Sequence, residues 1–299
     1  MNKSKIEWCD YTWNPVTGCL HNCPYCYAKR IVTRFSAHAE TNCEVIWNEQ
    51  GQEGPNRTID EPWTWDEKIQ PYPFGFEPTF HRYRLDEPQK IKKPSKVFVC
   101  SMADLFGDFI PDEWIEEIFN ACEAAPQHTY LFLTKNPKRY LILPTKWMLL
   151  KGGWFGTTAT QQSDIDKLSE YRFGDSHTNR FLSIEPILGP INIKKALGCQ
   201  ICEINSPSWY GRGQNRHLGH RSQGPNHYGC NRNLKWVIIG AQTGSGAVPP
   251  KREWVQSIMD QCKAAGVPVF LKNSLKALMG DNFIQEWPAG ISERLAEKL

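Results

Sequence analysis

The chain has 299 residues, a length that fits one large α/β barrel domain or two smaller domains with full cores. Its 35 Lys and Arg residues against 32 Asp and Glu residues give a net charge of only +3, which does not by itself indicate a nucleic-acid partner. The first residues lack the apolar stretch of a signal peptide, and no run of about 18 or more apolar residues predicts a membrane span.

Three of the eleven cysteines, Cys19, Cys23 and Cys26, lie within one short segment that follows an expected first strand. We expect a cytoplasmic protein, and in that reducing compartment clustered cysteines more often bind metal than form disulfides. Three thiolates on a four-iron cluster leave one iron open, as a reactive metal centre requires. A zinc knuckle completed by His21 or Cys9, or three unrelated buried thiols, are the alternatives.

Two segments are expected to interrupt the regular structure. Residues 43–77 are rich in Trp, Pro, Gly and Glu without a clear period, which predicts a long loop or lid insertion. Residues 198–233 are rich in Gly, Asn, Arg and His, and their ligand types predict a zinc-binding insertion. Its candidate ligands are Cys199, Cys202, His227 and Cys230. A disordered loop or an auxiliary cluster are the alternatives, and interleaved Arg and aromatic residues there also fit nucleic-acid binding.

A second early strand is expected at 78–84, and from residue 96 onward short apolar runs alternate with amphipathic helices. Pro111 opens a helix with Ile115, Ile118, Phe119 and Cys122 on one face, and Ser163-x-x-Asp166 predicts a helix N-terminal capping box. Trp254, Ile258 and Cys262 lie in line on a later helix. The expected strands are 97–99, 130–133, 154–156, 180–184, 235–239 and 267–271.

Apolar strands that alternate with helices predict a parallel sheet covered on both faces. With the two earlier strands, the sequence predicts six to eight βα units in a complete or partial (βα) barrel, with residues 1–299 as one domain. A doubly wound open sheet is the structural alternative.

Polar side chains follow the expected strands, where functional groups of such folds gather. Glu185 and Lys135 are candidates for cofactor or substrate contact, with a capping or solvated surface role as the alternative. Lys272 is read in the same way. A Gly-rich turn at Gly240 is a candidate anion or cofactor site, although a tight βα turn explains it equally well. Further cofactor-binding candidates are Ser101, Asp104 and Gln242.

The C-x3-C-x2-C spacing, with Tyr25 before the last cysteine, resembles the signature of the radical S-adenosylmethionine (SAM) superfamily. The segments 12–15, 101–106, 133–137, 185–190 and 237–246 resemble a phage-associated branch that is distantly similar to spore photoproduct lyase. The resemblance implies a 4Fe-4S cluster bound by Cys19, Cys23 and Cys26, with SAM on the open iron and Tyr25 near the adenine. It also implies a reductant protein such as flavodoxin or ferredoxin, and Cys100 as a hydrogen-atom donor, although a buried thiol is usually a small hydrophobe.

The expected function is therefore that of a radical SAM enzyme, which generates a 5′-deoxyadenosyl radical. The resemblance supplies no substrate, and a nucleobase or nucleic acid is the leading hypothesis. The same chemistry on a small molecule or peptide is one alternative. A non-catalytic zinc-binding nucleic-acid-recognition protein is the other.

Overall fold

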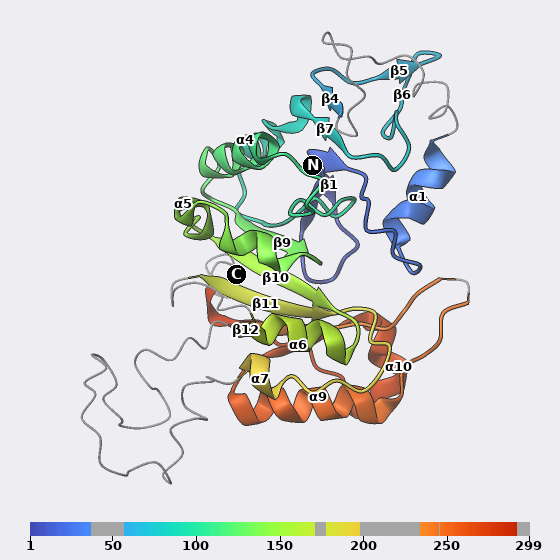
Figure 1. The fold of residues 1–299 in the computed structure, drawn as a ribbon, viewed down its shortest axis with the longest axis vertical. Coiled ribbons are helices and arrows are strands. Elements are labelled where there is room, and N and C mark those ends of the chain that lie inside the picture. Colours follow the sequence, from blue (N-terminus) through green and yellow to red (C-terminus); the bar gives the residue numbers. More distant parts are fainter. Residues whose placement is uncertain (37–56, 171–177, 198–233, 245, 292–299) are drawn as a thin grey trace, which may run out of the picture. The chain divides into compact units, whose positions relative to one another are not determined.

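The computed structural model describes residues 1–36, 57–170, 178–197, 234–244 and 246–291 (Figure 1). The chain forms two compact units, Met1–Thr157 and Thr158–Leu299. The fold is mixed α/β, and its main β-structure consists of eight mostly parallel strands. A closed barrel and a single domain over residues 1–299 stay predictions. None of the described helices has the length and apolar character that crossing a bilayer requires.

The first unit is built on a mostly parallel sheet with the order β1-β2-β8-β9-β10. The short strand β1 pairs antiparallel with β2, whereas β2, β8, β9 and β10 run parallel to one another. The expected strands before Cys19, at 97–99, at 130–133 and at 154–156 are confirmed within a residue or a few. The strands are β1 (Asn2–Lys3), β2 (Tyr11–Trp13), β8 (Lys96–Val99), β9 (Thr129–Thr134) and β10 (Gly153–Ala159).

The strand expected at 78–84 lies outside this parallel sheet, which corrects its assignment to a barrel unit. Only β7 (Thr79–His81) is extended, and it pairs antiparallel with β3 (Val16–Thr17) and parallel with β4 (Arg57–Ile59). All three side chains of β7 are buried, and a 3-10 helix follows the strand directly. The strand is therefore short and does not form one of the expected βα units. The described part of segment 43–77 also contains a two-stranded hairpin, β5 (Thr64–Trp65) and β6 (Lys68–Ile69).

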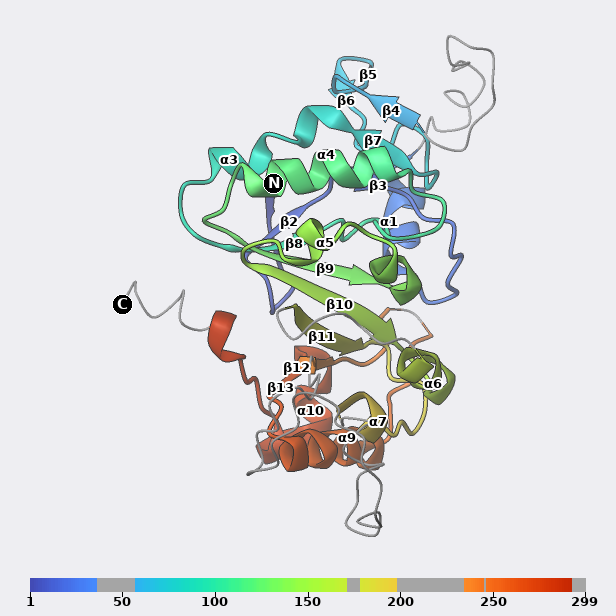
Figure 2. The ribbon, with the colours of Figure 1, turned by 60° about the vertical axis from the view of Figure 1, so that its left-hand side comes forward.

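The core of the first unit is aromatic and lies under helix α4, whose apolar face the sequence predicted. Ile115, Ile118, Phe119 and Cys122 are all fully buried, as their spacing requires. Phe119 stacks on Phe132 of β9, with ring centroids 5.0 Å apart. Figure 2 shows α4 along the strands that it covers. The helices of this unit are α1 (Tyr27–Phe35), α3 (Glu87–Lys90), α4 (Asp112–Glu123) and α5 (Thr145–Met148), with 3-10 turns η1 (Arg82–Arg84) and η2 (Pro137–Leu141).

The second unit contains three strands in the order β11-β12-β13, which are parallel to one another. Its aliphatic core joins these strands to α9, which buries Val255, Ile258, Met259 and Cys262. The elements are β11 (Asn179–Ile184), β12 (Leu234–Ile239), β13 (Val269–Leu271), α6 (Gln162–Glu170), α7 (Lys194–Leu197), α9 (Arg252–Ala265), α10 (Lys276–Met279), η4 (Asn273–Leu275) and η5 (Gly280–Asn282).

The predicted capping box is wrong, because Ser163 is not the N-cap residue of the helix. Helix α6 already begins at Gln162, so Ser163 lies inside its first turn. The Asp164 carboxylate instead reaches back and accepts the backbone N–H of Thr160 at 2.8 Å. Thr160 precedes the helix, so this bond fixes the turn that leads into α6, and the carboxylate also lies in the first turn, where the positive end of the helix dipole favours negative charge.

The aromatic core predicts the effect of one truncation. Phe119→Ala removes a ring that also stacks on Trp147 and leaves a cavity that the sheet side cannot fill. We expect a loss of roughly 3–5 kcal/mol in the free energy of unfolding, measured by urea denaturation. Glu116→Ala, on the exposed face of the same helix, is the matched control and should change stability by no more than about 0.5 kcal/mol. Equal losses in both variants would contradict this account of the core.

Candidate metal centre

The cysteine loop begins at a glycine that no other residue can replace without strain. Gly18 has φ +86°, and a Cβ there would lie 2.2 Å from the carbonyl oxygen of Glu77. Its N–H donates to the carbonyl of Met102 at 3.0 Å, and the next N–H, of Cys19, donates to Phe76 at 3.0 Å. The start of the loop is therefore held between the turn after β8 and the segment before β7.

A neutral histidine supports the residue before this glycine. His81 on β7 is fully buried, and its Nε2 is 2.8 Å from the hydroxyl of Thr17. Burial, with a smaller contribution from the charge of Arg84, lowers the pKa of His81 from its ordinary 6.5 to about 2. The imidazole therefore stays neutral at all ordinary pH values and can share a hydrogen bond with the hydroxyl.

The three cysteines follow in one irregular turn that ends in helix α1. Asn22 has φ +52°, a conformation that asparagine tolerates better than most residues, and its side chain accepts a hydrogen bond from Lys29 Nζ at 2.8 Å. Cys26 is the N-cap of α1, and its Sγ accepts the N–H of Lys29 at 3.4 Å. A helix N-terminus favours negative charge, so the third sulfur occupies a position suited to a thiolate ligand.

The thiols of the loop are close enough to influence one another. Burial, together with the smaller effects of the charges of Asp104, Cys23 and Cys26, raises the pKa of Cys19 to about 12, and a backbone hydrogen bond from His21 opposes this shift. Burial also raises the pKa of Cys23, while the nearby Lys135 ammonium lowers it. Bringing the sulfurs together as thiolates is therefore unfavourable without a cation among them, and bound metal would supply that cation.

Exposure separates these cysteines from the others in the described residues. Cys19, Cys23 and Cys26 are partly exposed, whereas the remaining described cysteines, Cys9, Cys100, Cys122 and Cys262, are buried. Within the described ranges, no three His, Cys, Asp or Glu side chains are gathered tightly enough to hold a metal ion. In a four-iron cluster each thiolate binds a different iron, so its ligands do not converge on one ion. Three thiols are the donor type that such a cluster uses, and the choice between a cluster and a zinc knuckle stays a prediction.

The loop is tied to the sheet through Asp104, which lies after β8 and is buried. Asp104 Oδ2 lies 2.8 Å from His21 Nε2 and accepts the N–H of Lys135, after β9, at 2.8 Å. Oδ1 accepts the N–H of Phe106 at 3.1 Å. A single carboxylate therefore connects the cysteine loop to the ends of two neighbouring parallel strands.

Other predicted cofactor-binding residues of the first unit surround the same loop. The Lys135 ammonium lies 5.6 Å from the centre of the Tyr25 ring, in cation–π contact. The Ser101 hydroxyl donates to Asn14 Oδ1 at 3.1 Å, and the Ser101 carbonyl accepts the Tyr27 hydroxyl. The structure thus brings Tyr25, Ser101, Asp104 and Lys135 to the loop, and their contacts with SAM stay predictions.

Cys100 lies in this region but is enclosed. Its side chain is buried, its backbone has φ +56°, and burial raises the pKa of its thiol to about 12. Its N–H donates to the carbonyl of Trp13 at 2.7 Å, which continues the pairing of β8 with β2. The hydrogen-donor role of Cys100 stays a prediction, and its surroundings are those of a small buried hydrophobe.

In the second unit the residues directly after the three strands form one cluster. Glu185, Gly240 and Lys272 follow β11, β12 and β13, and Lys272 Nζ donates to Glu185 Oε1 at 2.5 Å. A Cβ on Gly240 would lie 3.0 Å from both side chains, so the pair rests on this glycine. Close packing therefore requires a small residue at this position, and the binding of an anion or cofactor at Gly240 stays a prediction. Gln242 nearby is partly exposed, and its cofactor contact also stays a prediction.

The zinc-ligand candidates Cys199, Cys202, His227 and Cys230 lie outside the described residues. The prediction of a metal-binding insertion over 198–233 therefore stays a prediction, and zinc has no support among the residues that are described.

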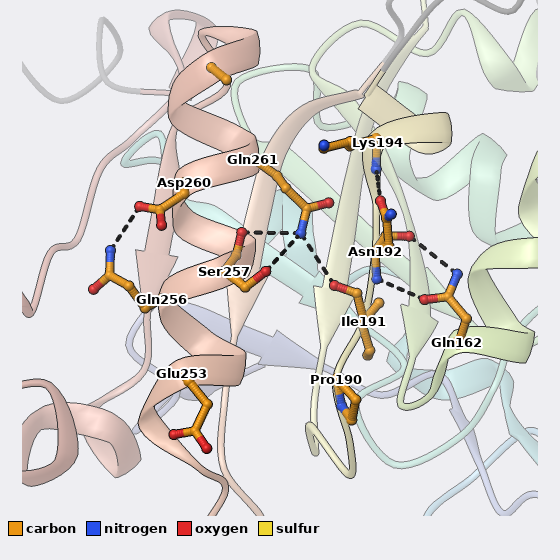
Figure 3. Close-up of a pocket in the computed structure, with 11 residues that line it drawn as sticks. Gln162, Pro190, Ile191, Asn192, Lys194, Glu253, Gln256, Ser257, Asp260 and Gln261 are labelled. Atoms are coloured by element: carbon orange, nitrogen blue, oxygen red, sulfur yellow. Dashed lines mark hydrogen bonds between the residues drawn. The ribbon is translucent and has the colours of Figure 1, made fainter.

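A separate concavity of about 730 Å³ lies in the second unit between α9, the start of α6 and residues 190–194 (Figure 3). Its amide side chains are bonded to the surrounding chain: Gln162 Oε1 accepts the N–H of Asn192 at 2.7 Å, and Gln261 Oε1 accepts that of Ile193 at 2.7 Å. These bonds hold the loop before α7 in place. None of the predicted site residues lines this concavity, so it is not the candidate centre.

Comparison with known proteins gives a family. A family model described as "Protein of unknown function (DUF5131)" matches residues 3–279. The chain belongs to this family. The DUF5131 match covers both compact units and every described site residue named above. No curated protein matches the chain.

A solved structure, "Spore photoproduct lyase complexed with dinucleoside spore photoproduct", is weakly similar to this DUF5131 protein. The alignment covers 91% of this chain and 79% of that chain, with a TM-score of 0.44 and 10% sequence identity.

Sequence reasoning missed two residues of the centre. His21 was considered only as a zinc ligand, and its bond to Asp104 depends on residues 83 positions apart. His81 carried no signal beyond its place on a buried strand. In contrast, Asn14 stood in a recognised segment, and its acceptance of the Met102 N–H at 3.0 Å explains why an amide is useful there.

The buried His81 predicts a dependence of stability on pH. The unfolded chain binds a proton at this histidine below about pH 6.5, while the folded chain does not until about pH 2. Its contribution to stability is therefore lost as the pH falls below 6.5, by up to about 1.4 kcal/mol for each unit. The difference in free energy of unfolding between wild type and His81→Gln should shrink between pH 7 and pH 5. Parallel urea-denaturation curves over that range would contradict the buried neutral histidine.

The packing over Gly240 predicts a second substitution effect. Gly240→Ala forces Glu185 and Lys272 apart and should destabilise the protein by about 1–3 kcal/mol in urea denaturation. Gly189→Ala is the matched control, because a Cβ there meets nothing within 4 Å. The control should be neutral or slightly stabilising, since alanine restricts the unfolded chain more than glycine does. Equal behaviour of the two variants would rule out the close approach.

Proposed function

We propose that this protein is a radical SAM enzyme that binds a 4Fe-4S cluster through Cys19, Cys23 and Cys26. The observation that carries the proposal is the state of these thiols: they are the partly exposed cysteines of the described residues and share one loop beside the ends of parallel strands. Three ligands leave the open iron that a reactive centre requires. A cluster held by these thiols would supply the electron for reductive cleavage of SAM bound at that iron.

The chain's own residues bind and orient this group. Gly18 allows the start of the loop to pack closely on the segment before β7. As the N-cap of α1, Cys26 holds the third sulfur at the N-terminus of that helix. Lys135 supplies positive charge beside Cys23 and suits the carboxylate of SAM. Tyr25, held against Lys135, is the aromatic side chain proposed to lie near the adenine.

For the substrate we keep the hypothesis of a nucleobase or nucleic acid. It rests on the sequence resemblance and on the Arg and aromatic residues of 198–233, which lie outside the described residues. Deuterium transfer from labelled candidates into 5′-deoxyadenosine distinguishes this hypothesis from a small-molecule or peptide substrate.

Anaerobic reconstitution with iron and sulfide tests the proposal. Wild type should bind about four iron atoms per chain, show iron–sulfur charge-transfer absorbance and, once reduced with SAM, produce 5′-deoxyadenosine. Cys23→Ala removes one ligand and should lose most of the iron and all detectable SAM cleavage.

Cys9→Ser is the matched control, because Cys9 is a buried thiol of the same unit that bonds to Ser4 rather than joining the loop. It should retain iron and cleavage. Zinc without iron in the wild type, with loss of zinc in Cys23→Ala, would establish the zinc-knuckle alternative instead. Loss of zinc in Cys9→Ser as well would identify Cys9, rather than His21, as the fourth ligand.

A further inference from the structure

The side chain of Asp104 accepts three hydrogen bonds from within the protein. Its side chain is almost fully buried, and its two oxygens together accept from His21, Lys135 and Phe106. A carboxylate offers about four lone-pair sites, so most of its accepting capacity is already used inside the protein. This occupancy favours a structural connection over direct contact with SAM.

The bond to His21 is the only one of the three that reaches the cysteine loop. His21 lies between Cys19 and Cys23, and its ring also packs edge-on against Phe109 with centroids 5.4 Å apart. The imidazole is thus fixed from two sides by residues of the segment after β8. Because His21 is two residues from either cysteine, fixing its ring also fixes the path of the backbone that carries both sulfurs.

The charge of Asp104 is not neutralised by a lysine or arginine. In the described part of the chain its side-chain partner is His21, which donates a hydrogen bond through Nε2, and the nearby Lys135 contributes its backbone N–H while its ammonium lies over Tyr25. The negative charge of Asp104 acts on both Cys19 and Cys23. In a buried site such a charge is weakly screened, so a bound cluster would also experience it.

We propose that Asp104 is a positioning residue that holds the cluster loop through His21 and whose fixed negative charge lowers the reduction potential of the cluster. The effect of Asp104 on the reduction potential rests on the proposed function. Its effect on the position of the cysteine loop does not, because that effect is also present in the protein without iron.

Hydrogen–deuterium exchange of the iron-free protein tests the hold on the loop. Asp104→Asn keeps the shape of the side chain but removes the charge that the three donors share, so amides in peptide 18–26 should exchange on the order of tenfold faster. Asp108→Asn is the matched control, because Asp108 lies on the same segment and bonds to Asn136, after β9, at 2.7 Å without reaching the cysteines. It should leave exchange in peptide 18–26 unchanged.

The charge is tested on the reconstituted protein by a redox titration monitored by electron paramagnetic resonance. Reduction adds negative charge to the cluster, so removing a nearby negative charge should shift the potential of Asp104→Asn upward. The potential of Asp108→Asn should not move. A purely structural role for Asp104 would loosen the loop without this upward shift, and that outcome overturns the charge half of the inference.

A second variant covers the case in which Asp104→Asn does not fold. His21→Phe keeps the packing on Phe109 and removes only the bond to Asp104, so it should also speed exchange in peptide 18–26. Unchanged exchange in His21→Phe overturns the hold on the loop. If wild type assembles no cluster, the proposed function and the charge half fail together, while the exchange data still decide whether Asp104 positions the loop.

Discussion

The candidate centre depends on one buried carboxylate. Asp104 lies in the segment that follows β8, accepts the N–H of Lys135 just after β9 and bonds to His21 of the cysteine loop. Parallel strands place their carboxyl ends at one edge of a sheet, and a group bonded to two of them shares their rigidity. The loop has little regular structure of its own, so this connection gives it a fixed position that a metal-binding loop needs.

In the second unit, one ion pair packed on a glycine connects the ends of the three strands. The side chains of Glu185 and Lys272 meet above Gly240, where any Cβ would be too close. The ion pair is partly exposed, so its own contribution to stability is modest. What the arrangement provides is a polar cluster on three adjacent strands, held by packing as much as by charge.

The sequence predicted local structure best where its signal is periodic. The face of α4 and the strands from residue 96 onward follow from runs of apolar residues with helical or extended spacing. The strand at 78–84 was assigned to the wrong sheet, because pairing partners distant in sequence decide where β7 lies. The start of α6 was misplaced: the helix begins at Gln162, and Asp164, not Ser163, bonds back to the N–H groups of the turn before it.

For the site, the sequence by itself determined the candidate residues: three thiols at C-x3-C-x2-C spacing, an aromatic residue beside the last one, and polar groups after apolar strands. The sequence shows these features directly, because each is a pattern of residues close together along the chain. Only the tertiary structure decided that Asp104 accepts three hydrogen bonds, one of them from His21, that His81 is buried and neutral, and that an ion pair packs on Gly240. Each of these depends on burial and on contacts between residues far apart along the chain, and the spacing of neighbouring residues predicts neither.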